Sequence, residues 1–257
     1  MNQISPLAFV HPEAKLGDNN IIGPFCYIDK NTVIGDNNVF QNSVTLHVGA
    51  RLGNNNEIFP GASISTKPQD LKFRNEETLC EIGDNNSIRE NVTISRGTAS
   101  KGKTKIGSNN LLMECVHIAH DCIIGDNCVL ANAATFAGHV EVEDYAVVGG
   151  LTAIHQFTRV GRHAMIGGCS AVTQDVVPYM LSEGNKARAV YINIVGLQRR
   201  GFSQEQIKRL RELYKIIFKK KLKLEEALQT VERDYGQYEE AQNLVNFIRK
   251  SKRGITR

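Results

Sequence analysis

An aliphatic side chain recurs at every sixth residue between Ile4 and Val172. Of the 29 positions in this series, 24 hold Ile, Leu or Val and two hold Phe, and only three polar residues interrupt it. An amphipathic helix repeats every ~3.6 residues and a half-buried strand every ~2, so neither explains this pattern. A six-residue period is typical of a solenoid, in which short strands alternate with corners.

Turn-forming residues follow many of the aliphatics, as in Ile34-Gly-Asp-Asn-Asn and Ile82-Gly-Asp-Asn-Asn. Gly and Asn tolerate the backbone geometry of corners. Three strands per turn predict a triangular parallel β-helix with about 18 residues per coil. A second inward position, four residues after each aliphatic, holds mostly small residues, as a narrow interior requires: Cys26, Thr32, Val44, Ala50, Ala62, Val92, Val116, Cys122, Cys128, Ala134, Val140, Ala146 and Ala164.

The period survives two interruptions, which predict loops that leave the solenoid near residues 65–81 and 95–105. Past Val172 the pattern stops and helix signals begin. Ser203-Gln-Glu-Gln206 is a capping box, and further helices are expected to begin near Leu224 and Tyr238. We therefore expect a β-helix over residues 1–185, followed by an α-helical domain over residues 186–257.

Charge divides at the same boundary. Residues 1–185 contain 13 Lys and Arg against 19 Asp and Glu, whereas residues 186–257 contain 18 against 8. A basic C-terminal region suggests an anionic partner, although a solvated helix face such as 219–223 explains it equally well. No nucleic-acid motif accompanies the charge, so nucleic acid is not expected as a partner.

The chain shows no sign of export or of membrane insertion. Its first residues lack the basic start and apolar stretch of a signal peptide, and no apolar run reaches membrane-spanning length. The six Cys are scattered singly, without a CxxC pair. Four of them share the second inward position, so they are expected to be reduced and buried. These features predict a cytoplasmic protein.

Outward polar residues gather at one place on the expected solenoid. Stacking by 18 residues puts His120, Gly138 and Gln156 in one column, with Asp121 and His139 in the next. An imidazole, a carboxylate and a bare backbone amide are the parts of a general base, its orienting group and an oxyanion donor. Two other interpretations stay open: polar decoration of a wet surface, and a zinc site built from His residues.

The chain resembles the acyl-carrier-protein-dependent UDP-N-acetylglucosamine 3-O-acyltransferases, which begin lipid A synthesis in Gram-negative bacteria. The resemblance extends over essentially the whole chain. The segments that carry it are Gln69-Asp-Leu-Lys72, Ile88-Arg-Glu, Arg96-Gly-Thr, Asn110-Leu-Leu-Met, His117-Ile-Ala-His-Asp121, Ala137-Gly-His139, His155-Gln-Phe157, Ile166-Gly-Gly-Cys169 and Gly196-Leu-Gln-Arg-Arg-Gly-Phe202.

This resemblance implies a left-handed parallel β-helix that forms a homotrimer, with active sites between neighbouring subunits. It implies direct transfer of an (R)-3-hydroxyacyl group from acyl carrier protein to the 3-hydroxyl of UDP-N-acetylglucosamine. The acyl donor is carried on the phosphopantetheine of the carrier. No bound cofactor and no metal are expected.

The resemblance also implies roles for single residues. His120 is expected to act as general base, with Asp121 orienting it and the Gly138 amide meeting the oxyanion. Gly168 matches a position that limits acyl-chain length. The positions that match substrate contacts are Asp70, Lys72, His117, His139 and Gln156 for the sugar and phosphates, and Asn193, Arg199 and Arg200 for the nucleotide.

Three residues depart from the family pattern. Ser95 and Lys186 each stand where well-known relatives carry His, and Val195 stands where they carry a nucleotide-contacting Glu. The rival hypotheses are an N-acyltransferase of the same pathway, a zinc-dependent lyase built on the same kind of solenoid, and a non-catalytic scaffold. The N-acyltransferase is disfavoured because the chain has no large N-terminal uridine-binding domain.

Overall fold

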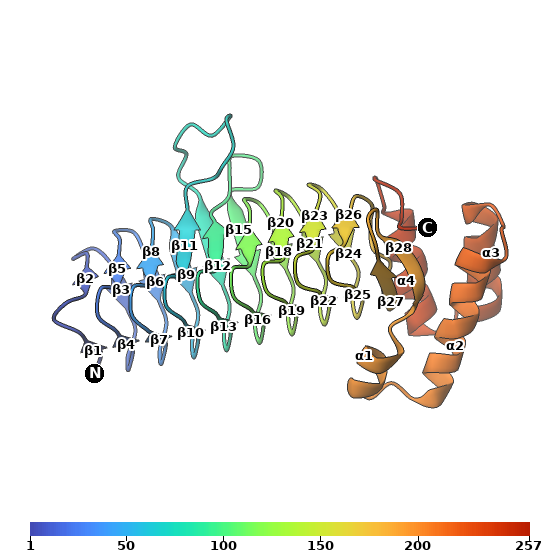
Figure 1. Cartoon of the computed structure of the whole chain (residues 1–257), viewed down its shortest axis with the longest axis horizontal. Coiled ribbons are helices and arrows are strands. Elements are labelled where there is room, and N and C mark those ends of the chain that lie inside the picture. Colours follow the sequence, from blue (N-terminus) through green and yellow to red (C-terminus); the bar gives the residue numbers. More distant parts are fainter.

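Three parallel sheets form the walls of a long triangular coil. The computed structural model describes residues 1–257, and Figure 1 shows the coil closed at one end by helices. Sheet A contains β1 (Gln3–Ile4), β4 (Ile21–Ile22), β7 (Val39–Phe40), β10 (Glu57–Ile58), β13 (Ser87–Ile88), β16 (Leu111–Leu112), β19 (Val129–Leu130), β22 (Val147–Val148), β25 (Met165–Ile166), β27 (Met180–Glu183) and β28 (Arg188–Ile192).

Sheets B and C complete the triangle. Sheet B contains β2 (Phe9–Val10), β5 (Tyr27–Ile28), β8 (Thr45–Leu46), β11 (Ser63–Thr66), β14 (Thr93–Ser95), β17 (His117–Ile118), β20 (Thr135–Phe136), β23 (Ala153–Ile154) and β26 (Ala171–Val172). Sheet C contains β3 (Lys15–Leu16), β6 (Val33–Ile34), β9 (Ala50–Leu52), β12 (Leu79–Ile82), β15 (Lys103–Ile106), β18 (Ile123–Ile124), β21 (Glu141–Val142) and β24 (Arg159–Val160). The predicted parallel β-helix is confirmed.

The inward residues stack in register from coil to coil. Ile94 pairs with Ile118, and Ile118 pairs with Phe136 in the next coil of sheet B. From Ile22 onward the aliphatic and small inward positions form one core cluster of 38 buried residues, which includes Cys26, Cys80, Cys122 and Cys128. At the open N-terminal end, Ile4 is 45% exposed. Each coil therefore buries its apolar side chains against its neighbours.

The glycines and asparagines of the repeat have different functions. Asn37 and Asn55 adopt φ values of 57° and 56°, the left-handed conformation that Asn tolerates at a corner. The glycines permit close approach of neighbouring coils: a Cβ on Gly35 would stand 2.6 Å from the carbonyl oxygen of Gly53. The sequence pattern of Gly and Asn thus encodes both the corner geometry and the spacing of coils.

Two loops leave the coil between sheets B and C. One covers residues 67–78 between β11 and β12, and the other covers 96–102 between β14 and β15. Figure 1 shows them side by side on one edge of the coil. The antiparallel hairpin β27–β28 then extends sheet A, with residue 185 in its turn.

A second core of 20 buried residues lies under the C-terminal helices. Ser203 caps α2 (Gln204–Tyr214) with the expected capping box. The two further helices begin where predicted, as α3 (Leu224–Tyr235) and α4 (Glu239–Arg249). The sequence patterns did not predict the short helix α1 (Ile194–Arg199) or the π-helical turn Lys215–Lys219. None of these helices has the length and apolar character needed to cross a bilayer.

Candidate functional site

The chain passes repeatedly from sheet A to B to C, so the coil has three edges. We call these the AB, BC and CA edges. The corner at residues 119–122, between β17 and β18, lies on the BC edge, as do both long loops. The predicted catalytic residues belong to this edge.

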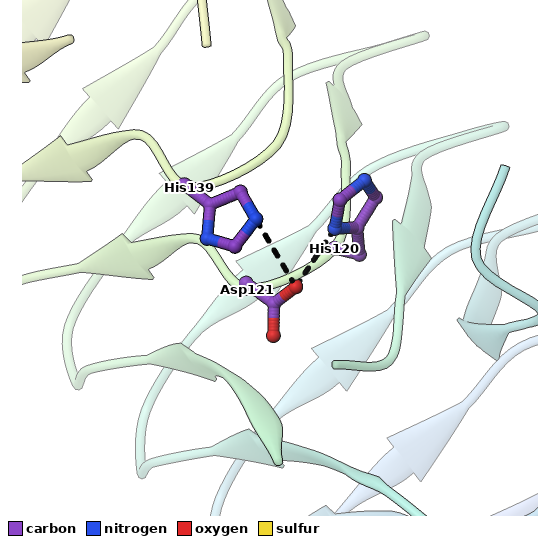
Figure 2. Close-up of side chains that lie close together, drawn as sticks. All are labelled: His120, Asp121 and His139. Carbon is purple, nitrogen blue, oxygen red and sulfur yellow. Dashed lines mark hydrogen bonds and ion pairs between the residues drawn. The ribbon is translucent and has the colours of Figure 1, made fainter. Parts of the chain in front are cut away.

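His120 and Asp121 form a hydrogen-bonded pair at their corner. The Nδ1 atom of His120 lies 2.8 Å from Oδ2 of Asp121. Figure 2 marks this contact with a dashed line. Neighbouring residues of a strand face opposite ways, but Asp121 has a φ of 61°, which turns its carboxylate to the same side as the ring. The carboxylate is fully buried and the imidazole is 14% exposed.

Asp121 is ionised in spite of its burial. Burial raises its pKa, but hydrogen bonds from His120 and Thr98 outweigh that effect and lower the pKa to about 2. Thr98 contributes twice, through its backbone N–H at 2.9 Å from Oδ1 and its hydroxyl at 2.7 Å from Oδ2. The hydroxyl of Thr104 accepts the Asp121 N–H at 2.9 Å. The loop 96–102 therefore helps to build the site.

The state of Asp121 determines the tautomer of His120. An ionised carboxylate can only accept hydrogen bonds, so the proton of the pair belongs to Nδ1 of His120. Nε2 of a neutral His120 then carries a free lone pair. This is the arrangement that a general base requires.

Gly138 lies directly against the His120 ring. A Cβ at residue 138 would stand 2.6 Å from Cε1 of His120, so no other residue fits there without displacing the imidazole. The Gly138 N–H donates no hydrogen bond within the chain, whereas its carbonyl accepts one from Phe157 at 3.2 Å. The structure thus places a free amide next to the candidate base.

His139 stands on the other side of the Asp121 carboxylate. Its Nε2 is 3.6 Å from Oδ2 of Asp121, and its ring stacks on Phe157 at 4.5 Å. Burial lowers the pKa of His139. Ligand atoms of His120, Asp121 and His139 lie within 4.8 Å of one another, so two nitrogens and one oxygen are placed where they suit a zinc ion. The zinc hypothesis therefore has a geometric basis.

The predicted sugar contacts gather near the same edge. His117, on β17, faces outward from sheet B, and its Nδ1 lies 2.7 Å from the hydroxyl of Thr93. Gln156 is exposed in the corner between β23 and β24. Asp70 and Lys72 belong to the loop 67–78, where the Lys72 N–H donates to Asp70 at 2.9 Å. The BC edge thus assembles the candidate base and its expected sugar contacts.

The expected nucleotide contacts lie elsewhere on the chain. Asn193 caps α1, where its side chain accepts the Gly196 N–H at 3.1 Å. Arg200 contacts the CA edge, over the ring of Tyr145 at 4.9 Å and near the Asn127 carbonyl at 3.4 Å. Arg199 lines a pocket of about 460 Å³ beside sheet A. One chain therefore does not bring these residues to His120.

Gly168 occupies the third edge. It is exposed in the corner between β25 and β26, on the AB edge. A Cβ there would stand 3.2 Å from the carbonyl oxygen of Gly150 in the coil before. The predicted site residues are thus distributed over all three edges of the coil.

The three departures differ in their surroundings. Ser95 is buried, with its hydroxyl 3.1 Å from that of Thr66. Val195 is 57% exposed at the start of α1, and Lys186 is exposed in the turn after β27. Sequence reasoning also missed Thr98, although it lies in the segment Arg96-Gly-Thr that carries part of the family resemblance.

The hexapeptide coil and the His–Asp corner define a hexapeptide-repeat transferase. A family model described as bacterial transferase hexapeptide matches residues 3–47 and 103–138. Another, described as UDP-N-acetylglucosamine O-acyltransferase, domain 2, matches residues 175–256. A curated acyl-[acyl-carrier-protein]–UDP-N-acetylglucosamine O-acyltransferase of Aliarcobacter butzleri is 48% identical, over 99% of this chain and 98% of that protein. The chain belongs to the UDP-N-acetylglucosamine O-acyltransferase family.

Solved structures agree in fold along the whole chain. A UDP-N-acetylglucosamine acyltransferase from Bacteroides fragilis matches with a TM-score of 0.97 and 49% identity, over 99% of this chain and 100% of that one. An Arabidopsis UDP-N-acetylglucosamine acyltransferase matches with a TM-score of 0.88 and 36% identity, over 99% and 100% of the two chains. The similarity therefore includes both the coil and the helical region.

Proposed function

We propose that the chain transfers an (R)-3-hydroxyacyl group from acyl carrier protein to the 3-hydroxyl of UDP-N-acetylglucosamine, the first step of lipid A biosynthesis. Membership of the family supports the reaction class, since the Aliarcobacter relative is named for acyl carrier protein and this sugar nucleotide. The observation that carries the mechanism is the His120–Asp121 pair, with Nε2 free beside the Gly138 amide.

In the proposed reaction, Nε2 of His120 removes the proton of the sugar hydroxyl as the oxygen attacks the thioester carbonyl carbon. The Gly138 N–H donates to the oxyanion of the tetrahedral intermediate. Collapse breaks the carbon–sulfur bond, and the leaving thiolate takes the proton from the imidazolium. Asp121 stabilises that imidazolium, because its carboxylate stays ionised. The acyl group moves directly, without an acyl-enzyme.

We further propose that the working site lies between copies of the chain in a homotrimer. The base belongs to the BC edge, whereas Arg200 contacts the CA edge and Gly168 belongs to the AB edge. A wall of the coil separates each pair of edges, so a substrate that touches all of them needs more than one chain. Neighbouring copies related by a threefold axis supply the missing edges.

The faces of the coil support this assembly. The outward positions of sheet C carry charged residues in most coils, such as Lys15, Arg51 and Glu141. Sheet B carries no charged residue among its outward positions, and the strands of sheet A from β1 to β25 carry only Glu57. Desolvating charge is costly, so we expect sheets A and B to face neighbouring copies and sheet C to face water.

The remaining site residues take their proposed roles from this arrangement. We assign Asp70, Lys72, His117, His139 and Gln156 to the sugar and phosphates, because they lie along the BC edge. The guanidinium groups of Arg199 and Arg200 suit diphosphate oxygens, with Asn193 beside them. Gly168 leaves room for the acyl chain. This chain arrives bound to the phosphopantetheine of the acyl carrier.

The reaction is tested by incubating the protein with UDP-N-acetylglucosamine and carriers that bear 3-hydroxyacyl chains of different lengths. Mass spectrometry is expected to identify an O-acylated sugar nucleotide. His120→Ala should lower kcat by at least about a hundredfold, since general-base catalysis contributes roughly 10²–10⁴-fold. Unchanged oligomeric state and thermal unfolding are the control for that variant. Normal turnover by His120→Ala would instead favour a non-catalytic scaffold.

Two rivals are separated by simple measurements. Acylation of a 3-amino sugar nucleotide, with none of the 3-hydroxyl compound, would identify an N-acyltransferase. The cluster of His120, Asp121 and His139 makes a zinc lyase the second candidate. Stoichiometric zinc in the purified protein, lost in His139→Ala, would favour that lyase over the proposed transferase.

A further inference from the structure

A cleft of about 930 Å³ opens on the sheet C side of the BC edge. The loop 96–102, sheet C and the last residues of the chain enclose it. Its lining residues are Ser100, Lys101, His139, Glu141, Phe157, Arg159, Asp175, Lys250, Lys252 and Arg253. His139 and Phe157 connect this cleft to the catalytic corner, because His139 also contacts Asp121.

The cleft has an excess of positive charge at one end. Its two acidic residues have partners within the chain: Glu141 forms an ion pair with Lys101 at 2.8 Å, and the buried Asp175 accepts the backbone N–H of Arg159 at 2.8 Å. Lys250 and Lys252 are exposed, and their side-chain ammonium groups form no ion pair or hydrogen bond with the chain. The C-terminal segment therefore presents unpaired cationic side chains to any ligand that enters the cleft.

The chain holds this segment in place. Arg253 donates from Nε to the Thr173 carbonyl at 3.2 Å, and Asp175 forms a parallel bridge with Ile255, which is 5% exposed. Figure 1 shows the chain end beside β28, at the closed end of the coil. Because the backbone of this segment is already fixed, less conformational entropy is lost when an anion binds.

We propose that this cleft is the entry site for the phosphopantetheine arm of the acyl carrier, and that Lys250, Lys252 and Arg253 bind its phosphodiester. The inference rests on the proposed function and adds to it the route by which the donor arrives. A protein-bound donor needs an entrance that stays open in the assembly, and sheet C is the face expected to meet water. The arm then runs past Phe157 and His139 toward His120, while the carrier stays outside.

The test compares three acyl donors that share one thioester: the acyl carrier, acyl-phosphopantetheine and acyl-pantetheine, which lacks the phosphate. In Lys250→Ala/Lys252→Ala, we expect KM for the first two donors to rise about tenfold, with kcat and KM for UDP-N-acetylglucosamine unchanged. KM for acyl-pantetheine should not change. Lys15→Ala/Lys30→Ala removes two exposed cations from the N-terminal coils and is the matched control.

A binding measurement makes the result independent of turnover. In calorimetry, phosphopantetheine should bind the wild type with an about tenfold lower Kd than pantetheine, and this difference should vanish in the variant and shrink at high salt. A loss confined to the intact carrier would overturn the assignment, because the segment would then contact the carrier's protein surface. An equal loss for all donors, or no loss, would also overturn it. No transfer by the wild type with any donor would contradict the proposed function itself.

Discussion

At the scale of single residues, the site depends on a carboxylate that is buried and yet charged. Asp121 accepts hydrogen bonds from the backbone N–H and the hydroxyl of Thr98, in the loop 96–102, and from His120. These bonds fix the carboxylate in one orientation, and the carboxylate in turn fixes the proton of His120 on Nδ1. Thr98 touches no reacting atom in the proposed mechanism, so we regard it as a positioning residue.

Thr98→Val keeps the shape of the side chain and removes one donor to Asp121. We expect kcat to fall about tenfold with little change in KM, because the imidazolium is less well stabilised, and Thr98→Ser to restore most of the rate. The depressed pKa of Asp121 stabilises the folded state above its unfolded pKa of about 3.9, and this stabilisation is lost as the pH falls through about 2.

The same variant should therefore be less stable than the wild type at pH 7, by about 1.5 to 2 kcal/mol for a charge-assisted hydrogen bond. The difference should shrink as both proteins approach pH 2. Denaturant unfolding at several pH values, together with kcat and KM, measures both effects. Equal stability loss at every pH, with kcat intact, would reduce Thr98 to an ordinary packing residue.

The sequence predicted which residues meet at the candidate catalytic corner, but it did not predict the residues that hold them in place. Stacking by the coil period placed Gly138 beside His120, and the structure brings them into contact. Thr98 was missed because its partner is 23 residues away and the intervening loop breaks the repeat. Such a contact depends on where the loop folds back, which no periodicity encodes.

At the scale of elements, the CA edge carries a column of stacked rings. His163 lies between Tyr145 and Tyr179, at centroid distances of 4.7 and 5.8 Å, and Phe202 meets its edge at 5.0 Å. The column joins the last coils to the segment that begins the helical region. Burial, with help from Arg162 and Arg200, lowers the pKa of His163 to about 4.

This lowered pKa predicts a loss of stability in acid. Between about pH 6.5 and pH 4 the unfolded state binds a proton at residue 163 that the folded state does not, so stability falls as the pH falls. Below about pH 4 both states are protonated and the loss levels off. His163→Phe, which can stack in the same place, should remove about 1 to 2 kcal/mol of this dependence, a value reduced for the partial exposure of the ring.

Urea unfolding of the wild type and His163→Phe at pH 7.5 and pH 4.5, at one protein concentration, measures the difference. Phe is compatible with the backbone, because Phe157 adopts a φ of 62° at an equivalent corner and His163 has 55°. Identical pH dependence of the two proteins would contradict a neutral, partly buried His163.

At the scale of the whole molecule, the proposed site residues lie on three edges of the coil, which a single chain does not bring together. The sequence repeat alone predicts part of this arrangement. The number of residues between His120 and Gly168 is not a whole number of coils, so the two residues belong to different edges. The positions of Arg199 and Arg200 did not follow from the repeat, because α1 lies outside it and its docking depends on contacts such as that of Arg200 with Tyr145.

A shared site predicts that two defective variants restore each other. His120→Ala lacks the proposed base and Arg200→Ala lacks the proposed nucleotide contact, so each alone should show little activity at low UDP-N-acetylglucosamine. If each site takes His120 from one chain and Arg200 from its neighbour, random mixing in equal amounts creates intact sites. About a quarter of the sites in such mixed trimers should be complete.

The matched control mixes wild-type chains with the double variant His120→Ala/Arg200→Ala, produced by the same co-refolding. Sites shared between chains predict about a quarter of wild-type activity in both mixtures, since each site draws its two residues from different protomers. Sites contained within one chain predict no activity in the first mixture and about half in the second. The ratio of the two mixtures, measured at equal total protein, therefore decides between a shared and a self-contained site without relying on absolute rates.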